Sequence, residues 1–503
     1  MIAPSRTFDL RIALAALVGL SLGSFVFLLG AKSFLVPLAG LLVLLVLAHP
    51  RLGLALTIIA AINFGSFGRF GSTEMLVFLS ISKILGVITL GAWILYTLRL
   101  KRRITFTKSM LAGALFISCS LISIAYAQHR QIAIADFLKL AANFVLYFLI
   151  VNLIETLRHL KQFILIIMVM GLIASVVAAA QYVSPALQVS GETTVIEFGK
   201  HEAAIANPEE LQSGEFTRPT GGLGHPNWLS VFLVSILAFN VYVLKSDVQK
   251  PIKLFALMVL SFELLALVLT HDRIGFVGMA TVFLLLLAKK VLEITPLRIV
   301  AMLFMIGLFV IAVPKTYLER VFSIEHYKQS ASISARWELQ TAGFDIFLDN
   351  WLFGVGQGNF GPVFMKTNTD VAADTHWLIE TAKSNYQDYW MGAHNMYLEV
   401  AVETGIIGLF TLLLFLATGI LDTHRTAELA AKTGKPIELD LAKVLQICLV
   451  AFCIAALFLH AQDQKIWWIV MGLLAAAKKI VEWGLPHHEG IGGLKPTLQI
   501  DRP

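Results

Sequence analysis

Long apolar runs separated by short polar segments dominate the pattern of this chain. A hydrocarbon core about 30 Å thick is crossed by about 20 apolar residues in a helix. Runs that reach or approach this length predict about fourteen crossings, at residues 12–30, 34–49, 52–67, 76–98, 109–127, 138–154, 162–182, 227–244, 254–270, 274–292, 297–313, 396–420, 444–460 and 466–481. Because the second and third runs are short, the pattern predicts an all-α, polytopic membrane helical bundle of about 12–14 transmembrane helices.

The composition agrees with a membrane protein and excludes an ordinary soluble domain. Charged residues make up 14% of the 503 residues and hydrophobic ones 57%, whereas a soluble domain carries about 25% charged residues. The mean hydropathy is +0.77. The formal net charge of +6 implies no nucleic-acid partner, because basic cytoplasmic loops account for it.

Basic residues set the orientation of the crossings. Arg99, Lys101, Arg102 and Arg103 mark one loop as cytoplasmic, since such loops carry an excess of Lys and Arg. Alternating from this loop places both termini in the cytoplasm and two long loops outside. The chain then divides into N-terminal transmembrane helices (1–182), an outer loop (183–226), transmembrane helices with arginine motifs (227–313), a large outer loop (314–395), C-terminal transmembrane helices (396–481) and a cytoplasmic tail (482–503).

The large outer loop is too long for a simple connector and is expected to be partly helical. Its aromatic and apolar residues recur at helical spacing, at Trp337, Phe344, Phe347, Leu348 and Trp351. Such a helix either lies along the membrane surface with its aromatic face down or packs a small core within the loop. The glycine-rich stretch 356–361 matches a nucleotide-binding pattern, but no strand and following helix frame it, and we interpret it as a turn.

Four polar clusters fall on the outer side of this topology. They are Arg218 before Gly221-Gly222, His271-Asp272-Arg273, Arg336-Trp337, and Ala393-His394-Asn395. Basic groups outside run against the usual bias toward the cytoplasm. Three arginines and a histidine on one outer face suggest a site for a phosphorylated substrate.

Helix polarity supports an anion site there. The crossings that begin near Asn227, Ile274 and Met396 run inward, so their N-termini point outward. A helix N-terminus presents free N–H groups and about half a positive charge, which attract anions. Arg218 precedes the first of these helices and Arg273 opens the second.

Arg336 follows Ser334, which would cap a helix and place the arginine in its first turn. A cation there opposes the helix dipole, a placement that makes sense if an anion binds nearby. The alternative for each arginine is that it reaches lipid phosphates or pairs with a neighbour, as Asp272 could with Arg273.

His394 is the candidate general base. It lies where a helix N-terminus disfavours the imidazolium form, so its ring should accept a proton. Asn395 and Tyr397 follow it as supporting residues. The alternative is that His394 is a polar anchor at the membrane boundary. Glu263, deep in the crossing at 254–270, is a further functional hypothesis, or a protonated group that forms a hydrogen bond between helices.

The candidate residues offer neither metal-ligand spacing nor an Asp-x-Asp pair. We therefore expect no metal and no cofactor, with arginines neutralising the phosphate charge instead.

These clusters resemble the signatures of the O-antigen ligase and O-antigen polymerase superfamily of bacterial membrane glycosyltransferases. The similarity covers roughly 215–410 in motif order. It is carried by Arg218-Pro219-Thr220-Gly221-Gly222 with His225-Pro226-Asn227, by Thr270-His271-Asp272-Arg273-Ile274-Gly275, by Arg336-Trp337 with Leu352-Phe353-Gly354-Val355-Gly356, and by Ala393-His394-Asn395-Met396-Tyr397-Leu398 with Glu403-Thr404-Gly405.

The resemblance implies an inverting glycosyltransferase in the bacterial inner membrane, with an active site that faces the periplasm and both outer loops periplasmic. Its donor would be an undecaprenyl-pyrophosphate-linked glycan. Its acceptor would be a lipopolysaccharide core sugar in a ligase, or a second lipid-linked repeat in a polymerase. A transporter or flippase of lipid-linked glycans is a third hypothesis, although transporters place their binding groups near the bilayer midplane.

The resemblance also implies roles for the residues. His394 would be the base, and Arg218, Arg273 and Arg336 would bind the pyrophosphate, with Asn227, Asn395 and Tyr397 in support.

Overall fold

The fold of the described residues is helical throughout. The structure is a computed structural model, which describes residues 35–63, 80–184, 218–293, 331–367 and 392–483. Within these ranges the chain forms helices and no strands, so the predicted all-α class is confirmed. The α-helices are α2 (Leu35–Ala48), α3 (Pro50–Asn63), α4 (Ile81–Arg99), α5 (Lys108–Ser123), α6 (Arg130–Leu153), α7 (Leu157–Val183), α10 (Pro226–Lys245), α11 (Lys250–Leu269), α12 (Arg273–Ala288), α16 (Ala331–Asp349), α17 (Phe360–Thr367), α20 (Met396–Lys432), α21 (Pro436–Ala455) and α22 (Lys465–Trp483).

The helices coincide with the predicted crossings wherever the structure describes them. Seven are long and apolar enough to span a membrane, namely α4, α6, α7, α10, α11, α20 and the stretch from α21 to residue 458. Shorter apolar helices lie at α2, α3, α5 and α12, and α22 occupies the last predicted crossing. The polytopic membrane bundle is thereby confirmed. The crossings predicted at 12–30 and 297–313 lie outside the described residues.

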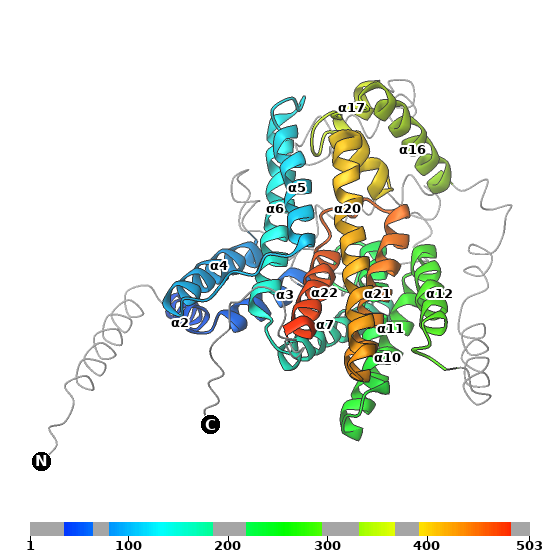
Figure 1. The fold of residues 1–503 in the computed structure, drawn as a ribbon. Helices are drawn as coiled ribbons and strands as arrows, with labels where there is room; N and C mark the ends of the chain where they lie inside the picture. The colour runs from blue at the N-terminus through cyan, green and yellow to red at the C-terminus, as the bar shows by residue number, and fades with distance from the viewer. Residues whose placement is uncertain (1–34, 64–79, 185–217, 294–330, 368–391, 484–503) are drawn as a thin grey trace, which may run out of the picture.

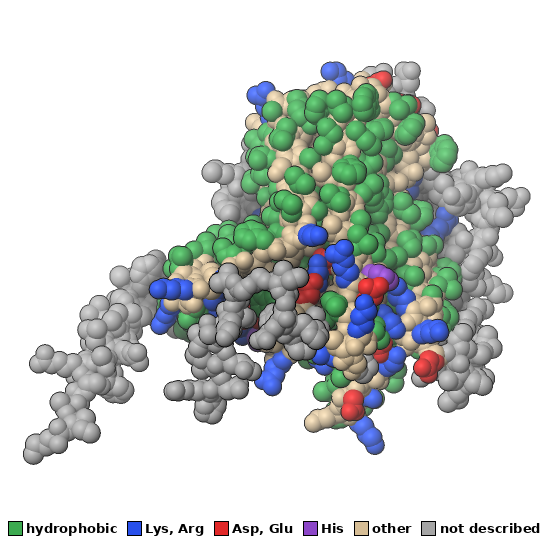
Figure 2. Space-filling view, in the orientation of Figure 1, with side chains coloured by type: hydrophobic (Ala, Val, Ile, Leu, Met, Phe, Trp, Pro, Cys, Tyr) green, Lys and Arg blue, Asp and Glu red, His purple; other side chains and the backbone are tan. Residues whose placement is uncertain are grey.

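The bundle and its outer cap are visible in Figure 1, where α5, α6, α20 and α21 stand side by side and α16 with α17 lies beyond one end of α20. Helices α2 and α4 extend to one side of the bundle. Figure 2 shows a broad hydrophobic surface over the region of α5, α6 and α20, with charged side chains gathered below it. Such a band matches the apolar surface that a bilayer requires.

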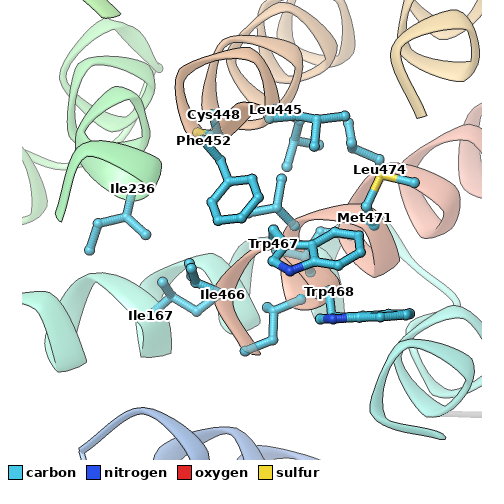
Figure 3. Packing of buried hydrophobic residues seen from close by; sticks show 14 of the residues in the cluster. Ile167, Ile236, Leu445, Cys448, Phe452, Ile466, Trp467, Trp468, Met471 and Leu474 are labelled. Atoms are coloured by element: carbon cyan, nitrogen blue, oxygen red, sulfur yellow. The ribbon is translucent and has the colours of Figure 1, made fainter. Parts of the chain in front are cut away.

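Helix α22 forms the centre of the bundle. Trp467 and Trp468 are fully buried, and Phe452 of α21 stacks on Trp467 with 5.8 Å between ring centroids. Figure 3 shows these rings surrounded by side chains from neighbouring helices. Each buried indole N–H donates to a backbone carbonyl, Trp467 to Ala461 and Trp468 to Gln462, both at 3.1 Å. The core tryptophans therefore also hold the turn that precedes α22.

Contacts between loops agree with the predicted topology. Arg51 and Arg102 both pair with Glu155. Arg102 was predicted inside, and the alternation of crossings places the other two residues on the same side. At the other end of α5, the Tyr126 hydroxyl donates to the carbonyl of Phe353 at 2.5 Å. Phe353 was predicted outside, and Tyr126 lies at the outer end of the crossing predicted at 109–127. Burial, with a smaller contribution from Cys119, raises the pKa of Tyr126 to about 12. The hydroxyl therefore keeps its proton as a donor. Which end faces the cytoplasm remains a prediction.

Helix α20 is broken at Gly405, and the outer loop fills the break. Gly405 has φ 68° and ψ −172°, a conformation that is essentially restricted to glycine. The N–H of Ile406 donates to Trp351 O at 2.8 Å, and Val402 O accepts from Val355 N at 2.9 Å. These bonds replace the helical bond that residues 402 and 406 would otherwise share, so the Ile406 N–H and the Val402 carbonyl both keep a partner.

The same loop is tied to α20 by a buried side-chain contact. The Gln357 amide donates to the Glu403 carboxylate at 2.7 Å, and Gln357 N donates to Ser123 Oγ at 2.9 Å. Gly354, Gly356 and Gly358 all have positive φ. Residues 351–359 form turns and follow a helix rather than a strand, so the predicted turn is confirmed, although helix α17 begins within the stretch at Phe360.

Helix α16 is described over Ala331–Asp349. The expectation that Ser334 caps this helix is wrong, because Ala331–Ile333 before it are already helical. Arg336 consequently lies in the second turn, where the free N–H groups of the terminus are not available to an anion.

Glu263 is fully buried in α11 and accepts a hydrogen bond from the Asn240 amide of α10 at 2.6 Å. It faces Gly171 of α7, where a β-carbon would lie 2.6 Å from its Oε1 atom. The expected hydrogen bond between helices is confirmed. It joins α10 and α11 at a depth where unpaired polar groups are costly.

Replacing Glu263 with leucine is expected to lower the free energy of unfolding by about 1–3 kcal/mol, because the Asn240 amide then loses its partner. The double variant Glu263→Leu/Asn240→Leu should recover most of this loss, since no orphaned polar group remains. Thermal unfolding of the purified variants in detergent measures both effects. Equal losses in the single and double variants would contradict a role for this pair.

Candidate functional site

Three helices begin at the end of the bundle that was predicted to be outside, each with a histidine in or just before its cap. His225 caps α10, and its Nδ1 accepts from Asn227 N at 3.1 Å. His271 precedes Asp272, the cap of α12. His394 precedes Asn395, the cap of α20. The predicted helix starts at all three motifs are confirmed, including Pro226 in the first turn of α10.

His271 and His394 share an uncommon backbone conformation. Their φ angles are +50° and +49°, in the left-handed region that few residues other than glycine adopt, although histidine does so more readily than most. In both turns a capping side chain follows, and Asn395 Oδ1 accepts from Tyr397 N and Leu398 N at 3.0 and 3.1 Å. The cap begins the helix while the preceding residue reverses the chain, so each histidine is held at a helix N-terminus.

Arg218 joins two of the motif segments. Its Nε donates to the carbonyl of Thr270 at 2.8 Å, and a terminal nitrogen donates to Asn227 Oδ1 at 3.0 Å. Thr270 directly precedes His271-Asp272-Arg273. The half-buried guanidinium therefore lies between the start of α10 and the turn that carries Arg273.

The segment after Arg218 is fastened to the end of α7. The N–H groups of Thr220 and Gly221 both donate to Gln181 Oε1 at 3.0 Å. Gly221 has φ +59°, and a β-carbon there would lie 2.7 Å from the carbonyl oxygen of Ala174. Glycine is thus required at this position by both conformation and space, and the close approach sets where Arg218 lies.

A row of rings connects the start of α10 to the start of α20. His225 lies 6.0 Å from Trp228, Trp228 lies 6.5 Å from His460, and His460 lies 5.5 Å from His394, measured between ring centroids. The last pair is edge to face. The row brings His394 to the same region as the Arg218 segment, although the two are far apart in sequence.

Glu399 organises the segment around His394. Its carboxylate accepts from Ala393 N at 2.8 Å and from the Gln462 amide at 2.7 Å. The carboxylate also interacts electrostatically with His460. A β-carbon at Gly392 would lie 2.6 Å from Glu399 Oε2 and 2.8 Å from His460 Nδ1. Glycine at 392 therefore allows the carboxylate and the second imidazole to approach each other behind His394.

The structure brings some predicted residues together and leaves others apart. Arg218, Asn227 and the turn with Arg273 are joined by the bonds above, and His394 is joined to α10 through the ring row. Arg273 is the half-buried first residue of α12. Arg336 is half-buried on α16, which packs on α20 and α17, so it is held to α20 rather than to the arginine motifs.

The supporting residues have mostly structural partners. Asn395 is the cap of α20, and the Tyr397 hydroxyl donates to the carbonyl of Cys453 at 2.8 Å. Asn227 positions Arg218, while its own Nδ2 is buried without a hydrogen-bond partner. A buried donor of this kind points to a missing acceptor.

Sequence reasoning missed His460 and Trp228. His460 lies at the end of a predicted crossing, where it looked like a boundary residue. The signal was available in the polar stretch His460-Ala461-Gln462-Asp463-Gln464, which interrupts two apolar runs on the outer side. Trp228 follows Asn227 directly but resembles an ordinary interfacial tryptophan in the sequence.

Comparison with known protein families agrees with this arrangement. Residues 254–413 match the family model described as O-antigen ligase. The match includes the motifs with Arg273, Arg336 and His394, whereas the Arg218 motif lies before it. No curated protein matches the chain. The match at residues 254–413 supports the resemblance to the O-antigen ligase superfamily that the motifs indicated.

Proposed function

We propose that this protein transfers a glycan from undecaprenyl pyrophosphate to a hydroxyl of a lipopolysaccharide core on the periplasmic side of the bacterial inner membrane. The observation that carries the proposal is the convergence of three histidine-bearing helix starts. Arg218 bonds to two of the segments involved, and the rings from His225 to His394 join the third. Cationic groups, helix N-termini and an imidazole in one place suit attack on a sugar that leaves from a diphosphate.

The arginines stabilise the leaving group. When the bond between the anomeric carbon and the diphosphate oxygen breaks, the electron pair and its negative charge stay on that oxygen. Arg218 and Arg273 lie beside the starts of α10 and α12, whose N–H groups add to the positive potential. The contacts of the described residues do not join Arg336, on α16, to these two arginines, and its part in the clamp rests on the family resemblance alone. Arginine suits this role because its planar donors match phosphate oxygens in pairs.

His394 accepts the proton of the acceptor hydroxyl while the hydroxyl oxygen forms a bond to the anomeric carbon. Attack from the side opposite the diphosphate inverts that carbon. Glu399 fixes the backbone beside His394 through Ala393 N, and His460 packs its ring against the base. The site holds the base in place before substrate binds, which lowers the entropy cost of reaching the transition state.

Replacing Arg273 or Arg218 with glutamine is expected to lower the rate of transfer by about 10–100-fold, because each charge-assisted hydrogen bond contributes about 1.5–3 kcal/mol. The assay uses purified protein and a lipid-pyrophosphate-linked glycan in detergent, where movement across a membrane cannot be scored. Arg130, an exposed residue at the start of α6, supplies the matched control Arg130→Gln. Unchanged transfer in both site variants would remove the proposed clamp.

Ligation and polymerisation use the same donor chemistry and differ in the acceptor. The family model's description favours ligation. A strain that lacks the protein should then lose all attached glycan from its lipopolysaccharide on a gel. Retention of a single attached repeat would indicate a polymerase instead.

A further inference from the structure

Helix α16 carries a stripe of aromatic and apolar side chains that the described part of the chain leaves exposed. Trp337 is 72% exposed, Phe344 52% and Leu348 53%. Trp351, just after the helix, is 55% exposed. With 3.6 residues per turn these positions lie on one face. Thr341 lies on the same face, and its hydroxyl donates to the carbonyl of Trp337 at 2.8 Å, so this face presents no unpaired side-chain donor there.

A different face of α16 supplies the packing of the outer cap. Leu339 and Ile346 are buried, 7% and 5% exposed, in a small core with Phe360 and Phe364 of α17. Of the five apolar residues that predicted this helix, only Phe347 packs against that core. Among the described residues, the alternative in which the stripe packs a core within the loop holds for Phe347 alone, and the other stripe residues face away from that core.

The stripe adjoins the exposed apolar surface of α20. Ile406 N donates to Trp351 O at 2.8 Å, so the end of the stripe meets α20 just after the break. From there Ile407 and Phe410 of α20 are exposed, by 40% and 63%, within a helix long and apolar enough to span a membrane. An apolar face that runs without interruption into a spanning helix borders the same bilayer.

The charges of α16 indicate how it would lie. Glu338, Asp345 and Asp349 are exposed, and each follows a stripe residue by one position, about 100° further round the helix. Arg336 lies on the opposite side of the stripe. If the stripe dips into the membrane interface, the acidic row and Arg336 flank it on its two sides at about the same height, near the headgroups.

We propose that α16 is an interfacial helix whose partner is the outer leaflet of the bilayer, with Trp337, Phe344, Leu348 and Trp351 inserted at headgroup depth. Tryptophan favours this depth because its ring is apolar and its N–H is polar. This placement rests on the proposed function in one respect, the position of the donor's diphosphate. The diphosphate of a lipid-linked donor lies in the headgroup layer, so the interfacial helix holds Arg336 at the height of its ligand.

Spin-label accessibility in lipid nanodiscs tests this placement without any donor. Nitroxide labels at Phe344→Cys and Leu348→Cys, in the full chain with alanine at the three native cysteines, should be relaxed more by oxygen than by a water-soluble nickel chelate. A label at Asp345→Cys is the matched control on the same helix and should show the reverse order. Thermal unfolding confirms that each labelled protein is folded.

Two results would overturn the proposal. Greater relaxation by nickel at 344 and 348 would mean that the stripe faces water. Protection from both reagents would mean that another segment of the chain or a second copy covers it. The spin-label experiment measures no glycan transfer. It can therefore contradict the placement of α16 without contradicting the catalytic assignments, and the transfer assay can contradict those assignments without contradicting the placement.

Discussion

Replacing His394 with asparagine is expected to lower the turnover of glycan transfer by about 10²–10⁴-fold, the usual contribution of a general base. Asparagine is the informative replacement because it tolerates the left-handed conformation that His394 adopts. The turn before α20 should therefore persist while the group that accepts the proton is lost. The loss should appear in kcat, measured with the purified protein at saturating donor, and leave KM for the donor nearly unchanged.

The variant His394→Ala serves as the comparison. It removes the same base but also places alanine at positive φ, which adds strain to the turn. We expect equal loss of turnover in both variants and a lower thermal stability only in the alanine variant. Wild-type turnover in His394→Asn would show that this histidine is an anchor, as the alternative interpretation of the sequence holds.

Replacing Gly405 with alanine is expected to lower the free energy of unfolding by about 3 kcal/mol and to abolish most of the transfer activity. Gly405 has positive φ, and a β-carbon there would overlap the backbone of Leu352 and Phe353. The loop at residues 351–356 would have to leave the break in α20, which would expose the backbone groups it satisfies. Thermal unfolding and the transfer assay measure the two effects.

Gly434 provides the control for this substitution. It also has positive φ, but a β-carbon there would meet nothing within 4 Å. Gly434→Ala should therefore cost only the conformational strain, about 1 kcal/mol, and keep its activity. Similar behaviour of the two variants would show that the packing of the outer loop into α20 does not matter for the site.

Local patterns carried most of the fold prediction. The twelve crossings that fall on described residues all coincide with helices, because hydrophobic length and helical hydrogen bonding are satisfied within each segment. The helix starts at Pro226, Arg273 and Met396 were also readable, since caps act on residues two or three positions away. The predicted start of α16 was wrong because the sequence does not distinguish a serine inside a helix from a serine at its cap.

Contacts between distant segments could not be read from the sequence. The insertion of the loop at 351–356 into the break at Gly405 joins residues about 50 positions apart, and no local pattern encodes it. His460 reaches His394 only because the two buried tryptophans of α22 hold its turn.

The sequence by itself determined the class of protein, the helices and the polar motifs, because burial in a membrane and helix capping depend on residues close to one another in the chain. The tertiary structure alone decided which motifs meet. Arg218 joins the α10 and α12 motifs, the ring row brings His394 to them, and the aromatic stripe of α16 turns away from the core. These outcomes depend on how helices pack against each other, and the apolar side chains that predict a helix do not specify which partner will cover them.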